Sequence, residues 1–105
     1  MKVLNIRSSS KEEKENSVYI GRNSKYWKLE NIDYFNGKYK NIFEVGKDGT
    51  IKEVLFKYEK YIRSKYSVEE IKRDLKGENL LCWCSPNYCH GNILKEICEN
   101  DVEFV

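Results

Sequence analysis

The stretch that decides the fold covers residues 79–92 and reads Asn79-Leu80-Leu81-Cys82-Trp83-Cys84-Ser85-Pro86-Asn87-Tyr88-Cys89-His90-Gly91-Asn92. Its first six residues form an apolar run that is typical of a buried central strand in a parallel sheet. Ser85-Pro86 ends that strand, because proline has no N–H group to donate within a sheet. Residues 90–100 then predict a helix with three apolar side chains on one face, Ile93, Leu94 and Ile97. The stretch therefore predicts a strand, a turn and a helix, which together indicate an α/β fold.

The residues before this unit predict two further strands and two further helices. We expect strands at residues 2–7 and 17–20, a polar loop at 8–16, and a long structured loop at 24–49 with a short extended piece at 41–43. Two capping boxes mark the helix starts, Thr50-x-x-Glu53 and Ser67-x-x-Glu70. The first helix carries its apolar residues at helical spacing: Ile51, Val54, Leu55, Tyr58, Tyr61, Ile62 and Tyr66. The second turns Ile71 and Leu75 inward and stops at Gly77.

This order of elements predicts a single α/β domain over residues 1–105. We expect a small Rossmann-like sandwich, in which a mixed or mostly parallel sheet is flanked by three helices. Residues 102–105 could add a strand at the edge of the sheet.

Length and composition exclude several classes of protein. The chain has 105 residues, 34% of them charged, and a formal net charge of +2. No apolar run approaches the roughly 20 residues needed to span a bilayer, and no secretory apolar segment follows the N-terminus. The basic residues do not gather into the stripe expected of a duplex-DNA binder. We therefore expect a soluble, cytoplasmic protein that binds neither membrane nor duplex DNA.

Residues 82–92 hold three of the four Cys, the only His and the only Pro. One interpretation is a metal site, because Cys82, Cys84, Cys89 and His90 supply the four ligands of tetrahedral zinc. Cys82 and Cys84 have one residue between them, whereas the usual pairs of zinc ligands have two to four residues between them. A zinc-stabilised interaction module is therefore the alternative interpretation.

The same residues also suit a ligand pocket at a strand-to-helix turn. In open α/β sheets ligands bind beyond the carboxyl ends of the strands, and a helix N-terminus offers N–H groups to phosphate. Gly91 would let a ligand approach the backbone, while Arg22, His90 and Asn92 could donate hydrogen bonds. We favour this pocket over the metal site.

A third interpretation gives Cys89 a chemical role. A thiol at a helix N-terminus beside His90 could act as a nucleophile or redox group. Cys82 and Cys84 could instead be small buried hydrophobic residues, as cysteines in reduced form often are. A disulfide between Cys82 and Cys84 is the least attractive explanation, because neighbours on one strand cannot pair without distortion.

The cysteine-rich motif resembles the hallmark of a small bacterial and phage family, domain of unknown function 4326. The motif reads Cys82-x-Cys84-x-Pro86-x-x-Cys89-His90-Gly91-x-x-Leu94. Upstream, Val18-Tyr19-Ile20-Gly21-Arg22 is similar to the family's Tyr-Ile-Gly-Arg strand end, and the resemblance covers about residues 3–98. Tyr39-Lys40-Asn41-Ile42 departs from the family's usual Trp-Gly-Asn-Pro. The resemblance implies an α/β fold and delivers no assigned activity.

We expect the pocket to bind a small phosphate-bearing nucleotide or a derivative such as ADP-ribose. Arg22 would hold phosphate, while Asn41 and an aromatic ring, Tyr19 or Trp27, would contact base or ribose. The full predicted site is Tyr19, Gly21, Arg22, Trp27, Asn41, Cys89, His90, Gly91 and Asn92. A phage protein of this kind would sequester a host immune nucleotide signal.

No catalytic residue and no cofactor other than the alternative zinc is expected. The chain has no Walker-type loop and no obvious carboxylate pair, which favours binding without turnover. An enzyme that processes nucleosides or ADP-ribose is a further alternative. The identity of the ligand and the formation of a homo-oligomer stay open.

Overall fold

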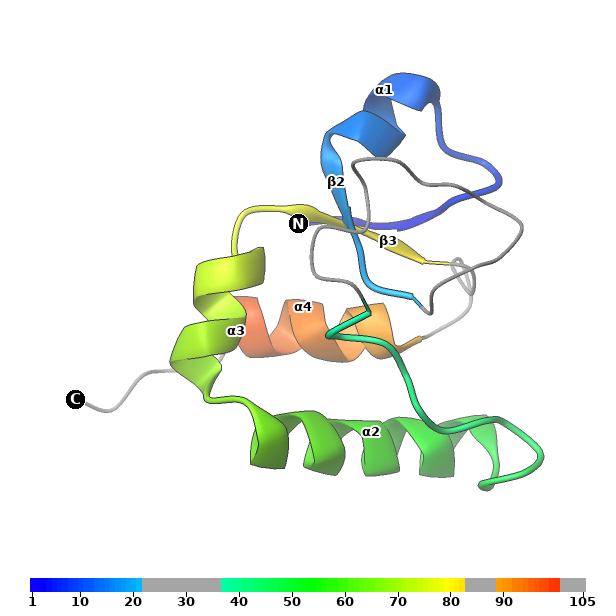
Figure 1. Ribbon diagram of the computed structural model, residues 1–105. Coiled ribbons are helices and arrows are strands. Elements are labelled where there is room, and N and C mark those ends of the chain that lie inside the picture. Colours follow the sequence, from blue (N-terminus) through cyan, green and yellow to red (C-terminus); the bar gives the residue numbers. More distant parts are fainter. Residues whose placement is uncertain (22–36, 83–88, 101–105) are drawn as a thin grey trace.

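The computed structural model describes residues 1–21, 37–82 and 89–100 (Figure 1). Its elements are β1 (Val3–Asn5), α1 (Lys11–Glu15), β2 (Ser17–Tyr19), α2 (Ile51–Lys65), α3 (Val68–Leu75), β3 (Asn79–Cys82) and α4 (His90–Asn100). Four predictions fall outside the described residues: the roles of Arg22, Trp27 and Cys84, and the edge strand at 102–105.

The three described strands form one parallel sheet in the order β1-β3-β2. Leu81 of β3 lies opposite Leu4 of β1 on one side and Tyr19 of β2 on the other. The apolar run that starts at residue 79 is therefore the central strand, as predicted. Because all three strands are parallel, their carboxyl ends meet at one edge of the sheet, and this edge leads into α4.

The two faces of the sheet carry separate hydrophobic clusters. Leu80 and Cys82 belong to the main core, whereas Leu81 packs with Ile6 and Tyr19 in a smaller cluster on the opposite face. This division follows from the alternation of side chains along a strand. Helices α2, α3 and α4 lie on the same side of the sheet, with α4 nearest to it (Figure 1). The fold is thus a small α/β domain with its core between the sheet and these three helices.

The predicted helix starts at residues 50 and 67 are confirmed. Thr50 and Glu53 form a complete capping box, in which the Thr50 side chain accepts from the Glu53 N–H and the Glu53 carboxylate accepts from the Thr50 N–H. Ser67 likewise accepts from the Glu70 N–H at 3.1 Å. One residue of the predicted apolar face differs, because Ile51 lies in the first turn of α2 and is 47% exposed. The rest of that face is buried or half-buried: Val54, Leu55, Tyr58, Tyr61, Ile62 and Tyr66.

The prediction of a loop over residues 8–16 is wrong, because α1 lies within it. Ser10 and Glu13 form a capping box. The Ser10 side chain accepts from the Glu13 N–H, and the Glu13 carboxylate accepts from the Ser10 N–H. The helix buries none of its residues. It therefore lacks the apolar periodicity by which a helix is usually recognised in sequence. The extended piece predicted at residues 41–43 is also absent as a strand, and the Asn41 side chain there accepts from the Phe43 N–H at 3.0 Å.

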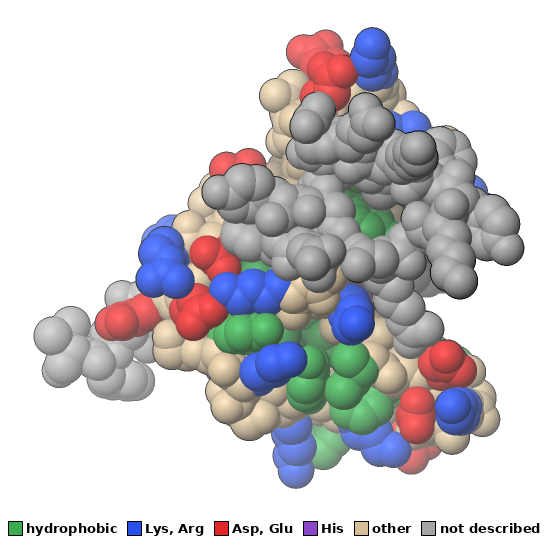
Figure 2. Space-filling model, viewed as in Figure 1, with side chains coloured by type: hydrophobic (Ala, Val, Ile, Leu, Met, Phe, Trp, Pro, Cys, Tyr) green, Lys and Arg blue, Asp and Glu red, His purple; other side chains and the backbone are tan. Residues whose placement is uncertain are grey.

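Charged side chains of both signs are interspersed over the visible surface (Figure 2). This pattern fits the small net charge of +2. Among the described helices, none combines the length and the apolar character that crossing a membrane requires.

Candidate functional site

The candidate site lies where the carboxyl edge of the sheet meets the start of α4. His90 is the first residue of α4 and is only 6% exposed. Its Nε2 lies 2.8 Å from the carbonyl oxygen of Ile20, the residue that follows β2. Its ring also meets the ring of Tyr58 edge-on, with centroids 5.2 Å apart. His90 therefore joins three elements, β2, α2 and α4, at the edge of the sheet.

A cavity of about 100 Å³ opens beside His90. Its lining comes from the loop before α2, from α2 itself and from the residues at the start of α4: Asn41, Val45, Ile51, Val54, Leu55, Cys89 and His90. Three residues of the predicted site thus line one cavity, Asn41, Cys89 and His90. The sequence does not predict the apolar wall from α2, because apolar residues at helical spacing indicate a core-facing helix.

Asn92 and Gly91 have structural contacts of their own. The Asn92 side chain accepts from the Cys89 N–H at 2.9 Å and so occupies one of the first N–H groups at the start of α4. A Cβ atom on Gly91 would lie 2.8 Å from Cγ1 of Val3 and 3.0 Å from Cδ1 of Ile20. Glycine at this position therefore lets α4 pack closely against the sheet. Neither residue is in the lining of the cavity.

Tyr19 lies on the other face of the sheet from His90, and Gly21 packs against the Tyr19 ring. Tyr19 is 2% exposed and packs with Ile6 and Leu81. A Cβ atom on Gly21 would lie 2.6 Å from the Tyr19 hydroxyl oxygen, so the tyrosine ring covers this glycine. The structure therefore does not bring Tyr19 together with the cavity at His90.

Cys82 and Cys89 meet in the core. Their sulfur atoms lie 3.4 Å apart, and the two residues are 0% and 3% exposed. Two of the four predicted zinc ligands are therefore neighbours, and His90 follows Cys89 directly. Cys84, the remaining predicted ligand, lies outside the described residues. Within residues 1–21, 37–82 and 89–100, no group of three or more His, Cys, Asp or Glu side chains is arranged to hold a metal ion.

A polar network fixes the loop that carries Asn41. Lys38 donates to Glu70 and, at 2.8 Å, to Asp74 of α3, and the Tyr39 hydroxyl donates to the same Asp74 carboxylate. The Tyr58 hydroxyl in turn donates to the Tyr39 carbonyl oxygen at 2.7 Å. The loop is thus attached to α3 and to α2 immediately before Asn41.

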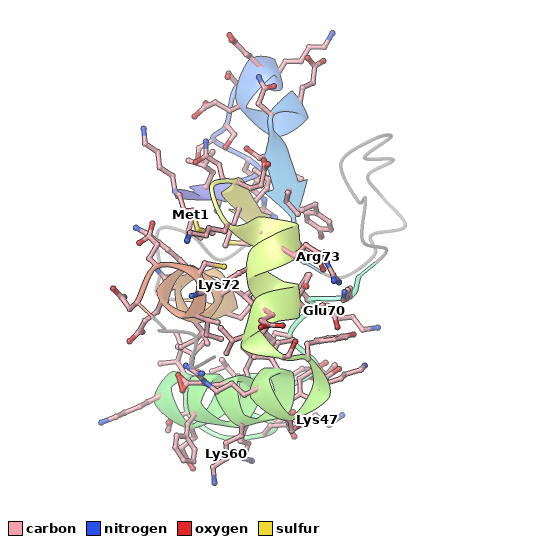
Figure 3. All side chains as sticks on the ribbon, turned by 90° about the vertical axis from the view of Figure 1, so that its left-hand side faces the viewer. Met1, Lys47, Lys60, Glu70, Lys72 and Arg73 are labelled. Atoms are coloured by element: carbon pink, nitrogen blue, oxygen red, sulfur yellow. The ribbon has the colours of Figure 1, made fainter. Side chains whose placement is uncertain are left out.

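The network changes the acidity of its members. Partial burial acts to raise the pKa of Asp74, but the hydrogen bonds from Lys38 and Tyr39 outweigh it and hold that pKa below its usual value. Burial and the neighbouring Asp74 carboxylate raise the pKa of Tyr39. Glu70 and Lys72 project from different sides of α3, so only one side of the helix serves this network (Figure 3). The sequence does not reveal this network, because an acidic helix face is usually solvated.

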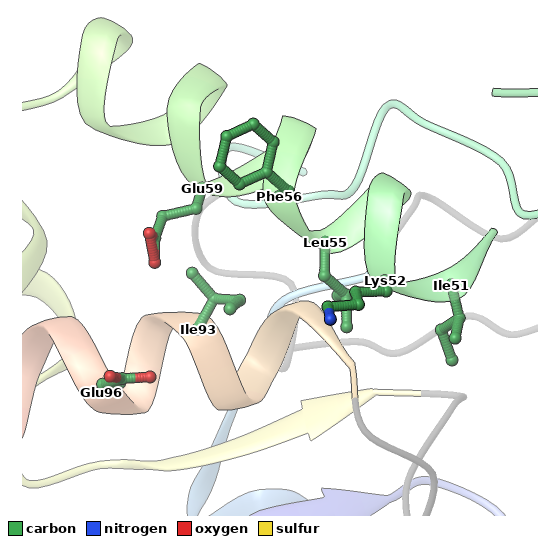
Figure 4. Close-up of a pocket in the computed structure, with 7 residues that line it drawn as sticks. All are labelled: Ile51, Lys52, Leu55, Phe56, Glu59, Ile93 and Glu96. Atoms are coloured by element: carbon green, nitrogen blue, oxygen red, sulfur yellow. The ribbon is translucent and has the colours of Figure 1, made fainter. Parts of the chain in front are cut away.

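A larger hollow of about 380 Å³ lies between α2 and α4 (Figure 4). Its apolar residues include Leu55, Ile93 and Phe56, and Phe56 is 62% exposed. Three charged side chains, Lys52, Glu59 and Glu96, also line it. None of the predicted site residues does so.

Comparisons with known proteins identify the family to which the chain belongs. The family model described as Domain of unknown function (DUF4326) matches residues 4–100. An uncharacterised protein of Acanthamoeba polyphaga mimivirus is 34% identical over 90 residues, a match that covers 76% of this chain and 65% of that protein. No solved structure matches the chain. Because the family model covers nearly all of its residues, the chain belongs to the DUF4326 family.

Proposed function

We propose that the cavity beside His90 binds a phosphate-bearing part of a small nucleotide or nucleotide derivative, such as ADP-ribose. One observation carries this proposal. The amide side chain of Asn41 and the residues at the start of α4, Cys89 and His90, line the same cavity at the carboxyl edge of a parallel sheet. Ligands of open α/β sheets bind at this edge.

The chemistry of the cavity suits an anion. The N-terminus of a helix carries N–H groups and a partial positive charge that attract phosphate, and α4 is 11 residues long. Asn41 adds an amide that can donate hydrogen bonds to phosphate or ribose oxygens. A volume of about 100 Å³ suits only a small group, so the rest of a nucleotide would lie outside the cavity. We assign that remainder to Arg22 and Trp27, and we leave Tyr19 out of the site because it packs on the other face.

We further propose that the protein binds this ligand without turnover. A phage or viral member of the family could then lower the concentration of a host nucleotide signal by sequestering it. The mimivirus relative supports a viral distribution of the family.

Thermal denaturation in the presence of inorganic phosphate, AMP and ADP-ribose tests the proposal. A ligand that binds only the folded chain raises the melting temperature with concentration. Asn41→Asp should lower the apparent affinity obtained from this shift at least tenfold, because it places a negative charge beside the anion. The variant keeps the side-chain oxygen that accepts from the Phe43 N–H. Asn79→Asp is the matched control, since Asn79 lies at the opposite end of the sheet and also uses its side-chain oxygen as an acceptor, from the Lys2 N–H.

The outcome also separates binding from catalysis. Intact ADP-ribose recovered after heat denaturation supports sequestration, whereas product formation would favour the enzyme alternative. If neither phosphate nor either nucleotide shifts the melting temperature, the proposed ligand class is wrong.

The zinc-stabilised module remains the second candidate, because Cys82 and Cys89 lie together. Tetrahedral zinc holds its thiolate ligands at about 2.3 Å, which brings two sulfur atoms within about 4 Å of each other. The observed 3.4 Å is compatible with that arrangement. About one zinc per chain by elemental analysis, with unfolding by a chelator, would establish this candidate in place of the first.

A further inference from the structure

We propose that Cys82 and Cys89 are an oxidisable pair that closes reversibly into a disulfide. Cys82 is the last residue of β3, and Cys89 immediately precedes α4. Their sulfur atoms are 3.4 Å apart in the core. The bond would join the central strand directly to the helix that begins at the candidate site. This inference concerns the protein without ligand and does not depend on the proposed function.

The positions of the two cysteines permit the bond. A disulfide has a sulfur–sulfur distance of about 2.05 Å, so the two atoms need to approach each other by about 1.4 Å. Both side chains are in the main core cluster, between the sheet and the helices. The distortion that disfavours a bond between Cys82 and Cys84 does not arise here, because Cys82 and Cys89 belong to different elements.

Hydrogen peroxide can serve as the oxidant, because it accepts the two electrons that the two thiols lose when the disulfide forms. Cys89 lines the cavity of about 100 Å³, which is large enough for a molecule of this size, whereas Cys82 is 0% exposed and does not line it. The Cys89 thiolate attacks one peroxide oxygen, the O–O bond breaks, and sulfenic acid and hydroxide form. The Cys82 thiol then attacks the Cys89 sulfur, the sulfenic hydroxyl leaves as water, and the disulfide forms. A dithiol such as dithiothreitol reverses the step by thiol–disulfide exchange.

Cys98 provides an internal control for this chemistry. It lies on α4, nine residues after Cys89, which corresponds to about 13 Å along a helix axis. Its sulfur lies 4.0 Å from the carbonyl oxygen of Ile71. It is as well buried as the proposed pair, at 1% exposed. Burial alone therefore cannot explain a difference between Cys98 and the pair.

Peptide mapping of the whole chain tests the proposal. Protein shown by elemental analysis to be metal-free is treated with hydrogen peroxide, alkylated under denaturing conditions and digested with chymotrypsin. Cleavage after Trp83 and Tyr88 places Cys82, Cys84 and Cys89 on separate peptides, and fragment-ion spectra distinguish Cys89 from Cys98 on the peptide that carries both. We expect a peptide pair linked through Cys82 and Cys89, the loss of two of the four alkylatable thiols, and recovery of both after dithiothreitol.

Variants identify the pair independently. Cys84→Ser and Cys98→Ser should keep the linked peptides, while Cys82→Ser and Cys89→Ser should lose them. Four alkylated thiols after peroxide treatment, or a bond that includes Cys84 or Cys98, would overturn the proposal. Mapping of the wild-type chain decides the question even if a variant fails to fold.

Discussion

The Nε2–H group of His90 donates to the carbonyl oxygen of Ile20 at 2.8 Å, and this hydrogen bond joins the start of α4 to the end of β2. Ile20 is held from its other side as well, because its N–H donates to the Leu81 carbonyl oxygen at 3.0 Å. The hydrogen bond thus connects α4 through β2 to the central strand. It fixes the helix N-terminus at the edge where the cavity lies.

Removing this hydrogen bond should destabilise the fold. His90→Phe keeps a ring against Tyr58 but leaves the buried Ile20 carbonyl without its imidazole donor. We expect a loss of about 1 to 3 kcal/mol in the free energy of unfolding, measured by urea denaturation. His90→Gln retains an N–H donor on its side chain and should lose less. A larger loss in His90→Gln than in His90→Phe would show that the ring, and not the hydrogen bond, stabilises this junction.

The close packing of α4 on the sheet predicts that Gly91→Ala is destabilising. The new methyl group would lie 2.8 Å from Cγ1 of Val3 and 3.0 Å from Cδ1 of Ile20. Overpacking of this kind costs about 1 to 3 kcal/mol. Val3→Ala removes the nearest atom, so the double variant should be more stable than the sum of the two single losses predicts. Strict additivity in this double-mutant cycle would contradict the proposed contact.

The network at Asp74 predicts a dependence of stability on acid pH. Its pKa is lowered in the folded chain, since the hydrogen bonds from Lys38 and Tyr39 outweigh the effect of burial. The stabilisation is therefore present above the ordinary carboxyl pKa of about 3.9 and is lost as the pH falls through the lower folded value. Arg73, whose Nε lies 3.8 Å from the same carboxylate, acts in the same direction.

Asp74→Asn tests this dependence. The variant should be less stable than the wild type at pH 7 by about 1 kcal/mol or more, because hydrogen bonds to a charged group are lost. The difference should shrink as the pH falls below the ordinary carboxyl pKa of about 3.9 and through the lower pKa that Asp74 has in the folded chain. Denaturation midpoints across a pH series measure it, with the exposed Glu78→Gln as a control for the lost charge. A constant difference across that range would rule out the carboxylate as its source.

Much of the fold could be predicted, because the helix-capping motifs and the spacing of the apolar residues indicate the same elements. Thr50-x-x-Glu53 and the apolar spacing after it indicate the same helix start, and the structure has both. The run from residue 79 is apolar on consecutive positions, as a strand covered on both faces requires. Ser10-x-x-Glu13 carries the same capping signal as Thr50-x-x-Glu53. The exposed helix after it has no apolar face, so no hydrophobic periodicity supports this capping signal in the sequence.

The candidate site was harder to predict, because it depends on contacts between distant residues. The sequence predicts Asn41 and His90 in one site, and in the structure both residues line one cavity. Tyr19 was assigned to the same site, but alternation along β2 places it on the other face of the sheet. Gly91 suggested space for a ligand, yet the space it leaves is occupied by Val3 and Ile20. The sequence groups Cys82 with Cys89 only within a set of four candidate zinc ligands, and no spacing rule singles out this pair.

The location of ligand binding tests the central claim most directly. Amide chemical shifts of the isotope-labelled chain, recorded during titration with ADP-ribose and separately with inorganic phosphate, report each backbone position. We predict saturable shifts at Asn41, His90, Gly91 and Asn92, with little change at Asn79 at the opposite end of the sheet. Shifts confined to the hollow between α2 and α4, around Phe56 and Glu96, or no saturable shifts with either compound, would contradict a phosphate-binding cavity beside His90.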